Sequence, residues 1–161
     1  MNAEQKRIIE ELYREMYDKL MAYARVNLDS ESLAEEAVQE TFHIACQKPE
    51  SVCSSINPQG WLVNTLRNTI RNMKRSRATA KRIVETYMMT QLREFSITED
   101  RINLNVLYEN VADTEEFRLL SEMAIEGRSH EEMAKSRGIT VSACKKRVQR
   151  AKETLQRKIK I

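Results

Sequence analysis

The sequence predicts an all-α protein built from two small helical domains. Its 161 residues include only 3 Gly and 2 Pro, and they are rich in Glu, Lys, Arg, Leu, Ala and Met, which lose little side-chain freedom in a helix. Apolar residues also recur three and four positions apart over most of the chain. The predicted organisation is a first domain at residues 1–80, a helical linker at 81–110 and a second domain at 111–161.

Two N-terminal helices are predicted from this spacing. The first covers residues 4–27 and carries one apolar stripe from Ile8 to Ala24. Ser30 or Ser32 then caps a second helix, because a serine hydroxyl accepts hydrogen bonds from the free N–H groups of a first helical turn. The apolar stripe of this helix ends at Ala45. Its opposite face is acidic and suits docking on a basic partner; it consists of Glu31, Glu35, Glu36, Gln39 and Glu40.

A loop is predicted at residues 47–57, followed by a third helix that starts near Pro58. The apolar stripe of this helix includes Trp61, for which core packing is the favoured interpretation, and it ends near Met73. Basic residues continue beyond that point, which favours phosphate contacts over burial in a membrane surface. The polar and basic side chains of this helix are Arg67, Asn68, Arg71, Asn72, Lys74, Arg75 and Arg77.

The C-terminal segment predicts a helix-turn-helix. Residues 78–110 come before it and are interpreted as a helix and a connecting segment. Capping boxes and helix-terminating glycines then mark three helices. The first has the box of Asp113 with Glu116 and ends at Gly127, and the second has the box of Ser129 with Glu132 and ends at Gly138. Thr140 is the N-cap of the third. The last helix has an inner stripe of Val141, Cys144, Val148, Ala151, Leu155 and Ile159. It turns outward Ser142, Lys145, Lys146, Gln149, Arg150 and Lys152.

Charge alternates along the chain in four blocks. Residues 1–50 carry 6 Lys and Arg against 11 Asp and Glu, and residues 51–84 carry 7 against none. Residues 85–143 carry 6 against 12, and residues 144–161 carry 8 against 1. Two separate cationic surfaces suit a polyanion touched at two places, since Lys and Arg release condensed counterions from phosphate. Two solvated helix faces are the alternative.

Several classes of function are disfavoured. Three cysteines without a CxxC spacing argue against a disulfide framework or a thiolate-rich zinc site. His43 and Cys46 lack the further ligands that a structural zinc needs, so we expect no metal and no cofactor. No nucleophile–base pairing or Gly-rich phosphate loop indicates an enzyme. No apolar run approaches the ~20 residues of a membrane span, and residues 1–10 lack a signal-peptide core. A soluble, cytoplasmic protein is expected.

Five segments together resemble the extracytoplasmic-function sigma factors of bacterial RNA polymerase, which consist of little more than regions 2 and 4. Residues 34–42 resemble the core-binding helix of that family, and residues 58–72 resemble its promoter-melting helix. Residues 126–134, 138–141 and 145–152 resemble its region 4. The resemblance covers most of the chain, in the family's order and at family-like separations. It departs from the pattern at Asn72, where Asp is frequent, and at Ala143, where Thr is common.

The resemblance implies a role for each cluster of residues. The acidic face would bind the β′ clamp of core polymerase, through Glu35, Glu36, Gln39 and Glu40. The third helix and the end of the preceding loop would hold the melted minus ten element as a single strand, through Asn57, Trp61, Arg67, Asn68, Arg71, Lys74 and Arg75. The last helix would read the minus thirty-five element as duplex, through Thr140, Ser142, Lys145, Lys146, Gln149 and Arg150.

Further partners implied by the resemblance are the β flap of polymerase, promoter DNA and an anti-sigma protein. A member of this family directs promoter-specific transcription initiation and has no catalysis of its own. The alternative from a different class is a stand-alone helix-turn-helix regulator that binds duplex operators without polymerase.

Overall fold

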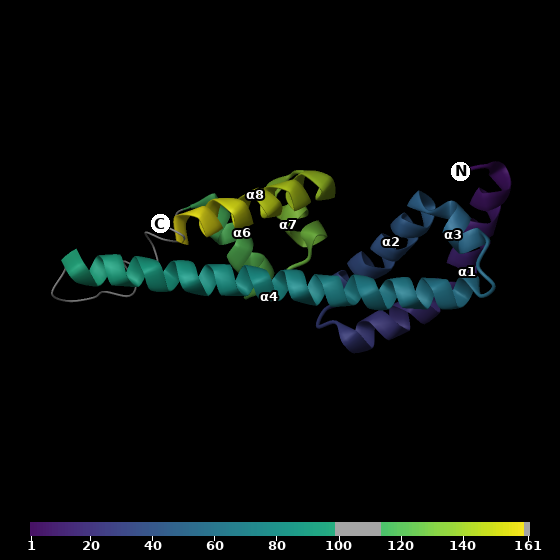
Figure 1. Cartoon of the computed structure of the whole chain (residues 1–161), viewed down its shortest axis with the longest axis horizontal. Coiled ribbons are helices and arrows are strands. Elements are labelled where there is room, and N and C mark those ends of the chain that lie inside the picture. The colour runs from purple at the N-terminus through teal and green to yellow at the C-terminus, as the bar shows by residue number, and fades with distance from the viewer. Residues whose placement is uncertain (99–113, 160–161) are drawn as a thin grey trace. The chain divides into compact units, whose positions relative to one another are not determined.

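The structure is a computed structural model that describes residues 1–98 and 114–159 (Figure 1). Every regular element in these ranges is an α-helix, which confirms the all-α prediction. The chain divides into two compact units, Met1–Arg75 (unit 1) and Ser76–Ile161 (unit 2). Each unit has its own core of buried apolar side chains. None of the helices in the described residues is both long and apolar enough to cross a bilayer.

Unit 1 begins with two long helices, α1 (Ala3–Asn27) and α2 (Glu31–Gln47). Asn2 caps α1 and forms a capping box with Gln5, while the Ser30 hydroxyl accepts from the Leu33 N–H at 3.2 Å and caps α2, as predicted. The apolar stripes of both helices meet in one core. Its largest fully buried side chains are Leu20, Met21, Val38, Thr41, Val52, Leu62 and Leu66.

The predicted loop at residues 47–57 is only partly correct. Its middle forms a short helix, α3 (Pro49–Cys53), in which Pro49 occupies the first turn and Val52 is fully buried. Proline is well suited to that position because its missing N–H has no partner in a helix start anyway. Within residues 47–57, the chain is irregular at Lys48 and from Ser54 to Asn57.

The helix α4 (Pro58–Thr98) starts where the sequence predicts but is far longer than expected, with 41 residues (Figure 1). Residues 61–98 contain no Gly or Pro to end it. Its part after Arg75 belongs to unit 2, where Ile83, Val84 and Tyr87 are buried. The described part of the expected linker at 81–110 therefore contributes to the second core, because its apolar residues recur at helical spacing.

Unit 2 completes its core with α6 (Glu115–Ala124), α7 (His130–Arg137) and α8 (Val141–Ile159). The rings of Tyr87 in α4 and Phe117 in α6 lie 6.0 Å apart at a tilt of 42°. The predicted inner stripe of α8 is buried from Cys144 to Leu155, and Ile159 packs against it partly buried. Val141 was placed on this stripe but is 39% exposed, because burial in α8 begins at Cys144.

Most of the predicted capping residues and glycines of unit 2 lie at the turns between its helices. Ser129 and Glu132 form the expected capping box at the start of α7. Gly138 ends that helix in the left-handed region at φ +63°, where a side chain is strained, and Gly127 has φ +68°. The first predicted box is different: α6 has Thr114 as its N-cap residue. Asp113, the predicted cap, lies outside the described residues.

Candidate nucleic-acid interface

Unit 1 presents a cationic face on α4, formed by Arg67, Arg71, Lys74 and Arg75. All four side chains are exposed. Their spacing of four, three and one residues places them along one side of the helix, opposite the buried Leu66 and the other apolar residues. None of the four forms an ion pair within the part of the chain that the structure describes. Their charge is therefore available to an external anion.

Asn57 has a structural role at the start of α4. Its side-chain oxygen accepts a hydrogen bond from the Gly60 N–H at 3.0 Å, so it serves as the N-cap. A Cβ atom at Gly60 would lie 2.6 Å from the Asn57 amide nitrogen, so a larger residue there would displace the capping side chain. Trp61 is partly buried and packs against the core of unit 1, as the packing interpretation expects. Of the residues predicted for the single strand, Trp61 is therefore set back from the cationic face.

Two exposed residues of unit 1 that precede the cationic face along the chain were not singled out from the sequence. Ile56 in the irregular Ser54–Asn57 segment is 104% exposed. Asn64 is exposed one helical turn before Asn68 and shares its side of α4. The helical spacing alone gave a signal for Asn64, whereas the exposure of Ile56 depends on how the short segment after α3 is folded.

The acidic face of α2 is less uniform than its sequence. Gln39 is exposed, while Glu35, Glu36 and Glu40 are partly buried. Glu31 forms a two-pronged ion pair with Arg25 of α1, the shortest N–O distance being 2.7 Å. Hydrogen bonds from this guanidinium lower the pKa of the Glu31 carboxyl below its usual value. Glu31 therefore connects the end of α1 to α2 rather than adding a free charge to the face.

The outer face of α8 carries the residues predicted for duplex DNA, and all of them are exposed: Thr140, Ser142, Lys145, Lys146, Gln149 and Arg150. Thr140 also caps the helix, since its hydroxyl accepts from the Ala143 N–H at 3.1 Å. Arg150 lies to one side and lines a shallow hollow of about 300 Å³ with Glu115 and Glu116. The amide of Gln149 donates to Glu153 at 3.1 Å.

Lys152 was expected on the outer face and is found elsewhere. Its side chain is partly buried and its Nζ donates to the Ser76 hydroxyl of α4 at 2.6 Å. Burial lowers the pKa of this ammonium because the charged form loses hydration. A long lysine side chain can cover apolar surface in this way, so Lys152 belongs to the packing of unit 2.

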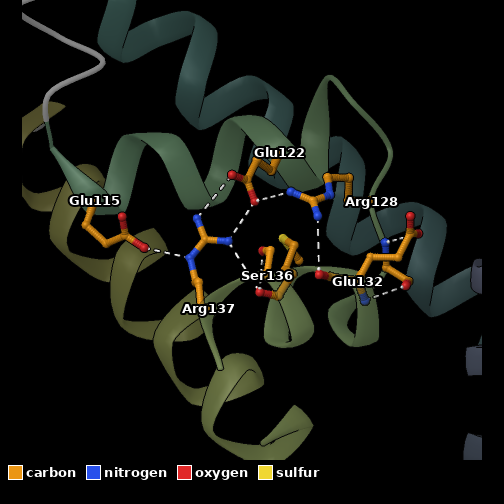
Figure 2. A network of polar contacts seen from close by, with 8 residues as sticks. Glu115, Glu122, Arg128, Glu132, Ser136 and Arg137 are labelled. Carbon is orange, nitrogen blue, oxygen red and sulfur yellow. Dashed lines mark hydrogen bonds and ion pairs between the residues drawn. The ribbon is translucent and has the colours of Figure 1, made fainter. Parts of the chain in front are cut away.

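A network of ion pairs connects α6 with α7 (Figure 2). Arg137, the last residue of α7, donates from Nε to Glu115 and from Nη1 to Glu122, both at 2.7 Å. Arg128, in the turn before α7, also pairs with Glu122 at 3.2 Å. The hydrogen bonds that Arg137 donates to the Glu122 carboxylate raise the pKa of its guanidinium. Arg128 and Arg137 therefore connect the turn before α7 and the end of α7 to α6.

Among the residues that the structure describes, no three His, Cys, Asp or Glu side chains are grouped so that they could hold a metal ion. The three cysteines are free, and Cys144 is buried in the core of unit 2. The candidate interface consists of charged, amide and hydroxyl side chains, together with the exposed Ile56.

Comparison with known proteins gives one match to a family and one similar solved structure. The family model for sigma-70 region 2 matches residues 12–80, which cover most of unit 1. A chain in the solved structure of the RsbN–BldN complex is 20% identical, with 92% of this chain and 89% of that chain covered at a TM-score of 0.38. No curated protein matches the sequence significantly. The region 2 match confirms the part of the resemblance that was drawn from the motifs at residues 34–42 and 58–72. Residues 12–80 of the chain are therefore similar to region 2 of the sigma-70 family.

Proposed function

We propose that this chain is a sigma factor that binds core RNA polymerase through α2 and contacts promoter DNA twice, through α4 in unit 1 and α8 in unit 2. The observation that carries this proposal is the pair of exposed cationic helix faces on two units with separate cores. Such faces bind phosphate chiefly by releasing counterions. Two independent units suit two DNA elements that differ in structure.

In unit 1, the cationic face of α4 holds the melted minus ten strand by its phosphates. Asn68 and the newly recognised Asn64 add amide groups beside it, which donate to and accept from the edges of unpaired bases. Ile56 projects from the segment next to the α4 N-terminus, where an apolar side chain suits stacking against an extruded base. An unpaired base leaves the duplex when such contacts offset the loss of stacking and pairing.

In unit 2, the outer face of α8 enters the major groove of the intact minus thirty-five element. The second helix of a helix-turn-helix places its first turns against base edges. Lys145, Lys146 and Arg150 donate to guanine edges or phosphates there, and Ser142 and Gln149 contribute neutral polar groups. The hydroxyl proton of Thr140 remains available to a phosphate, since this side chain acts only as an acceptor in its cap.

Protein partners of the proposed complex follow from the family. The α2 face with Glu35, Glu36, Gln39 and Glu40 binds the β′ clamp, and unit 2 binds the β flap. An anti-sigma protein that covers both cationic faces would keep the factor from polymerase and DNA together.

In vitro transcription with core polymerase over fragmented genomic DNA tests the proposal and identifies the promoter at once. Specific transcripts that depend on the chain are expected. A stand-alone regulator would instead bind duplex DNA without retaining core polymerase in a pull-down, and that result would reject the proposal. The region 2 match favours the sigma factor over this alternative.

A further inference from the structure

One acidic side chain lies on the outer face of the basic helix α8. Glu153 is the single Asp or Glu in Val141–Ile159, and it is exposed one turn after Gln149. A carboxylate on a face that approaches phosphates is repelled by them and reduces affinity. The presence of a residue that lowers affinity for DNA is accounted for if it improves the discrimination of one DNA sequence from another.

Glu153 determines how the Gln149 side chain points. The Gln149 Nε2 donates to Glu153 Oε1 at 3.1 Å, across one helical turn. An ionised carboxylate only accepts hydrogen bonds, so it selects the amide rotamer that turns the NH₂ group toward it. The contact is weak in water because both side chains are exposed, and it strengthens when a bound duplex displaces water.

In this orientation, Gln149 presents one acceptor and one donor: its carbonyl oxygen and its second N–H. The major-groove edge of adenine offers the complementary pair, the N6 amino group and the N7 acceptor. Guanine presents two acceptors there, so its O6 would face the glutamine oxygen. We propose that Glu153 fixes Gln149 as an adenine reader in the duplex element. Glu153 is then a positioning residue that sets base preference without touching the base. The inference rests on the proposed duplex contact of α8.

The test uses the full chain with core polymerase. The wild-type holoenzyme first selects its site from a randomised duplex library, and binding is then measured for every single-base variant of that site. Adenine is expected to be preferred over guanine at one position by about tenfold, which is typical of one bidentate contact. Glu153→Ala frees the amide to rotate and should reduce that preference to about twofold, with the preferences at other positions unchanged.

A double-mutant cycle identifies the route of the effect. In a Gln149→Ala background, Glu153→Ala should have no further effect on the adenine preference. An equal effect in that background would mean that Glu153 reads a base directly, and it would overturn the inference. Gln156→Ala, which removes another exposed amide of α8, is the matched control and should leave the preference intact.

Two failures are distinguishable. If the wild-type holoenzyme selects a duplex site but Glu153→Ala leaves its base preferences unchanged, the inference on Glu153 is wrong and the proposed duplex contact stands. If no duplex site is selected, the proposed function of α8 fails and the inference fails with it. Glu153→Gln, which keeps an acceptor oxygen but no charge, serves as a second variant and should retain more of the adenine preference than alanine does.

Discussion

Arg137 is the residue on which the geometry of unit 2 depends most. Its guanidinium bridges two carboxylates of α6 from the last position of α7, and its side chain is only 13% exposed. A planar fork with fixed donors suits this double contact, whereas a lysine ammonium offers a single charged point. The next residue is Gly138, so any shift of Arg137 is passed directly to the turn that leads into α8.

Replacing Arg137 should therefore destabilise unit 2. Arg137→Met leaves Glu122 partly buried beside Arg128 alone, and we expect the free energy of unfolding to fall by about 2–3 kcal/mol, below the range for fully buried pairs. Arg137→Lys should cost about 1 kcal/mol. Urea unfolding followed by circular dichroism measures the loss. The fluorescence of Trp61, the only tryptophan and a residue of unit 1, is the internal reference. Glu126→Gln, an exposed acid outside the network, should cost almost nothing; an equal loss there would contradict the assignment.

Lys152 makes a second prediction, on pH. Its pKa is lowered in the folded protein, so the folded state binds fewer protons than the unfolded state just below the ordinary lysine pKa of about 10.4. Stability contributed by this group therefore rises with pH through that window, and burying the ammonium is costly at neutral pH. Lys152→Met should stabilise the chain most at neutral pH, by roughly 0.5 kcal/mol after solvent screening, and progressively less toward pH 10.

Thermal unfolding from neutral to alkaline pH measures this difference. Lys158→Met is the matched control, because Lys158 is exposed on the same helix. A stability difference for Lys152→Met that stays constant across the pH range would show that lost packing, rather than the buried charge, governs the effect.

At the scale of helices, the features that the sequence predicts correctly are those set by residues close together in the chain. Caps such as Ser30 and Thr140, the start of α4 at Pro58 and the buried stripe of α8 follow from spacing and side-chain chemistry. The predictions are wrong where a structure depends on packing between distant residues. Residues 49–53 form α3 rather than a loop and bury Val52 in the core, and α4 is longer than predicted and contributes buried residues to both cores. The partial burial of Lys152 depends on α4, a helix distant in sequence, so periodicity within α8 assigned it to the wrong face.

The exposed cations of α4 predict how unit 1 binds single strands. Arg67→Ala, Arg71→Ala and Arg75→Ala together should weaken binding of a single-stranded oligonucleotide. The slope of log affinity against log salt should become shallower by about 2, because each lost phosphate contact removes about 0.7. Fluorescence anisotropy over a salt series measures both effects.

The control for this prediction removes the same charge from another helix of unit 1. Lys6, Arg7 and Arg14 of α1 are all exposed, and their triple replacement by alanine changes the net charge equally. If both triple variants lose the same affinity and the same slope, the total charge of unit 1 rather than the α4 face binds the strand.

For the whole molecule, two separate cores imply two separable functions. Gln39→Ala with Glu40→Ala alters only the α2 face of unit 1, so core polymerase association should fall at least tenfold while the intrinsic duplex affinity of the full chain stays unchanged. Lys145→Ala, Lys146→Ala and Arg150→Ala should have the opposite pattern, with weaker duplex binding and polymerase retained. Gln39 and the three residues of α8 are exposed, and Glu40 is only partly buried, so neither set of substitutions should unfold the other unit.

Measuring both affinities for both variants makes this prediction a double dissociation. Core polymerase binding is measured by titration with a labelled chain, and duplex binding by anisotropy without polymerase. Transcription, which needs both contacts on one chain, should be lost in either variant and should not return when the two variants are mixed. Recovery on mixing would mean that the two contacts act from different chains. The alternating charge of the sequence would then describe an assembly of several copies rather than one factor that binds polymerase and promoter together.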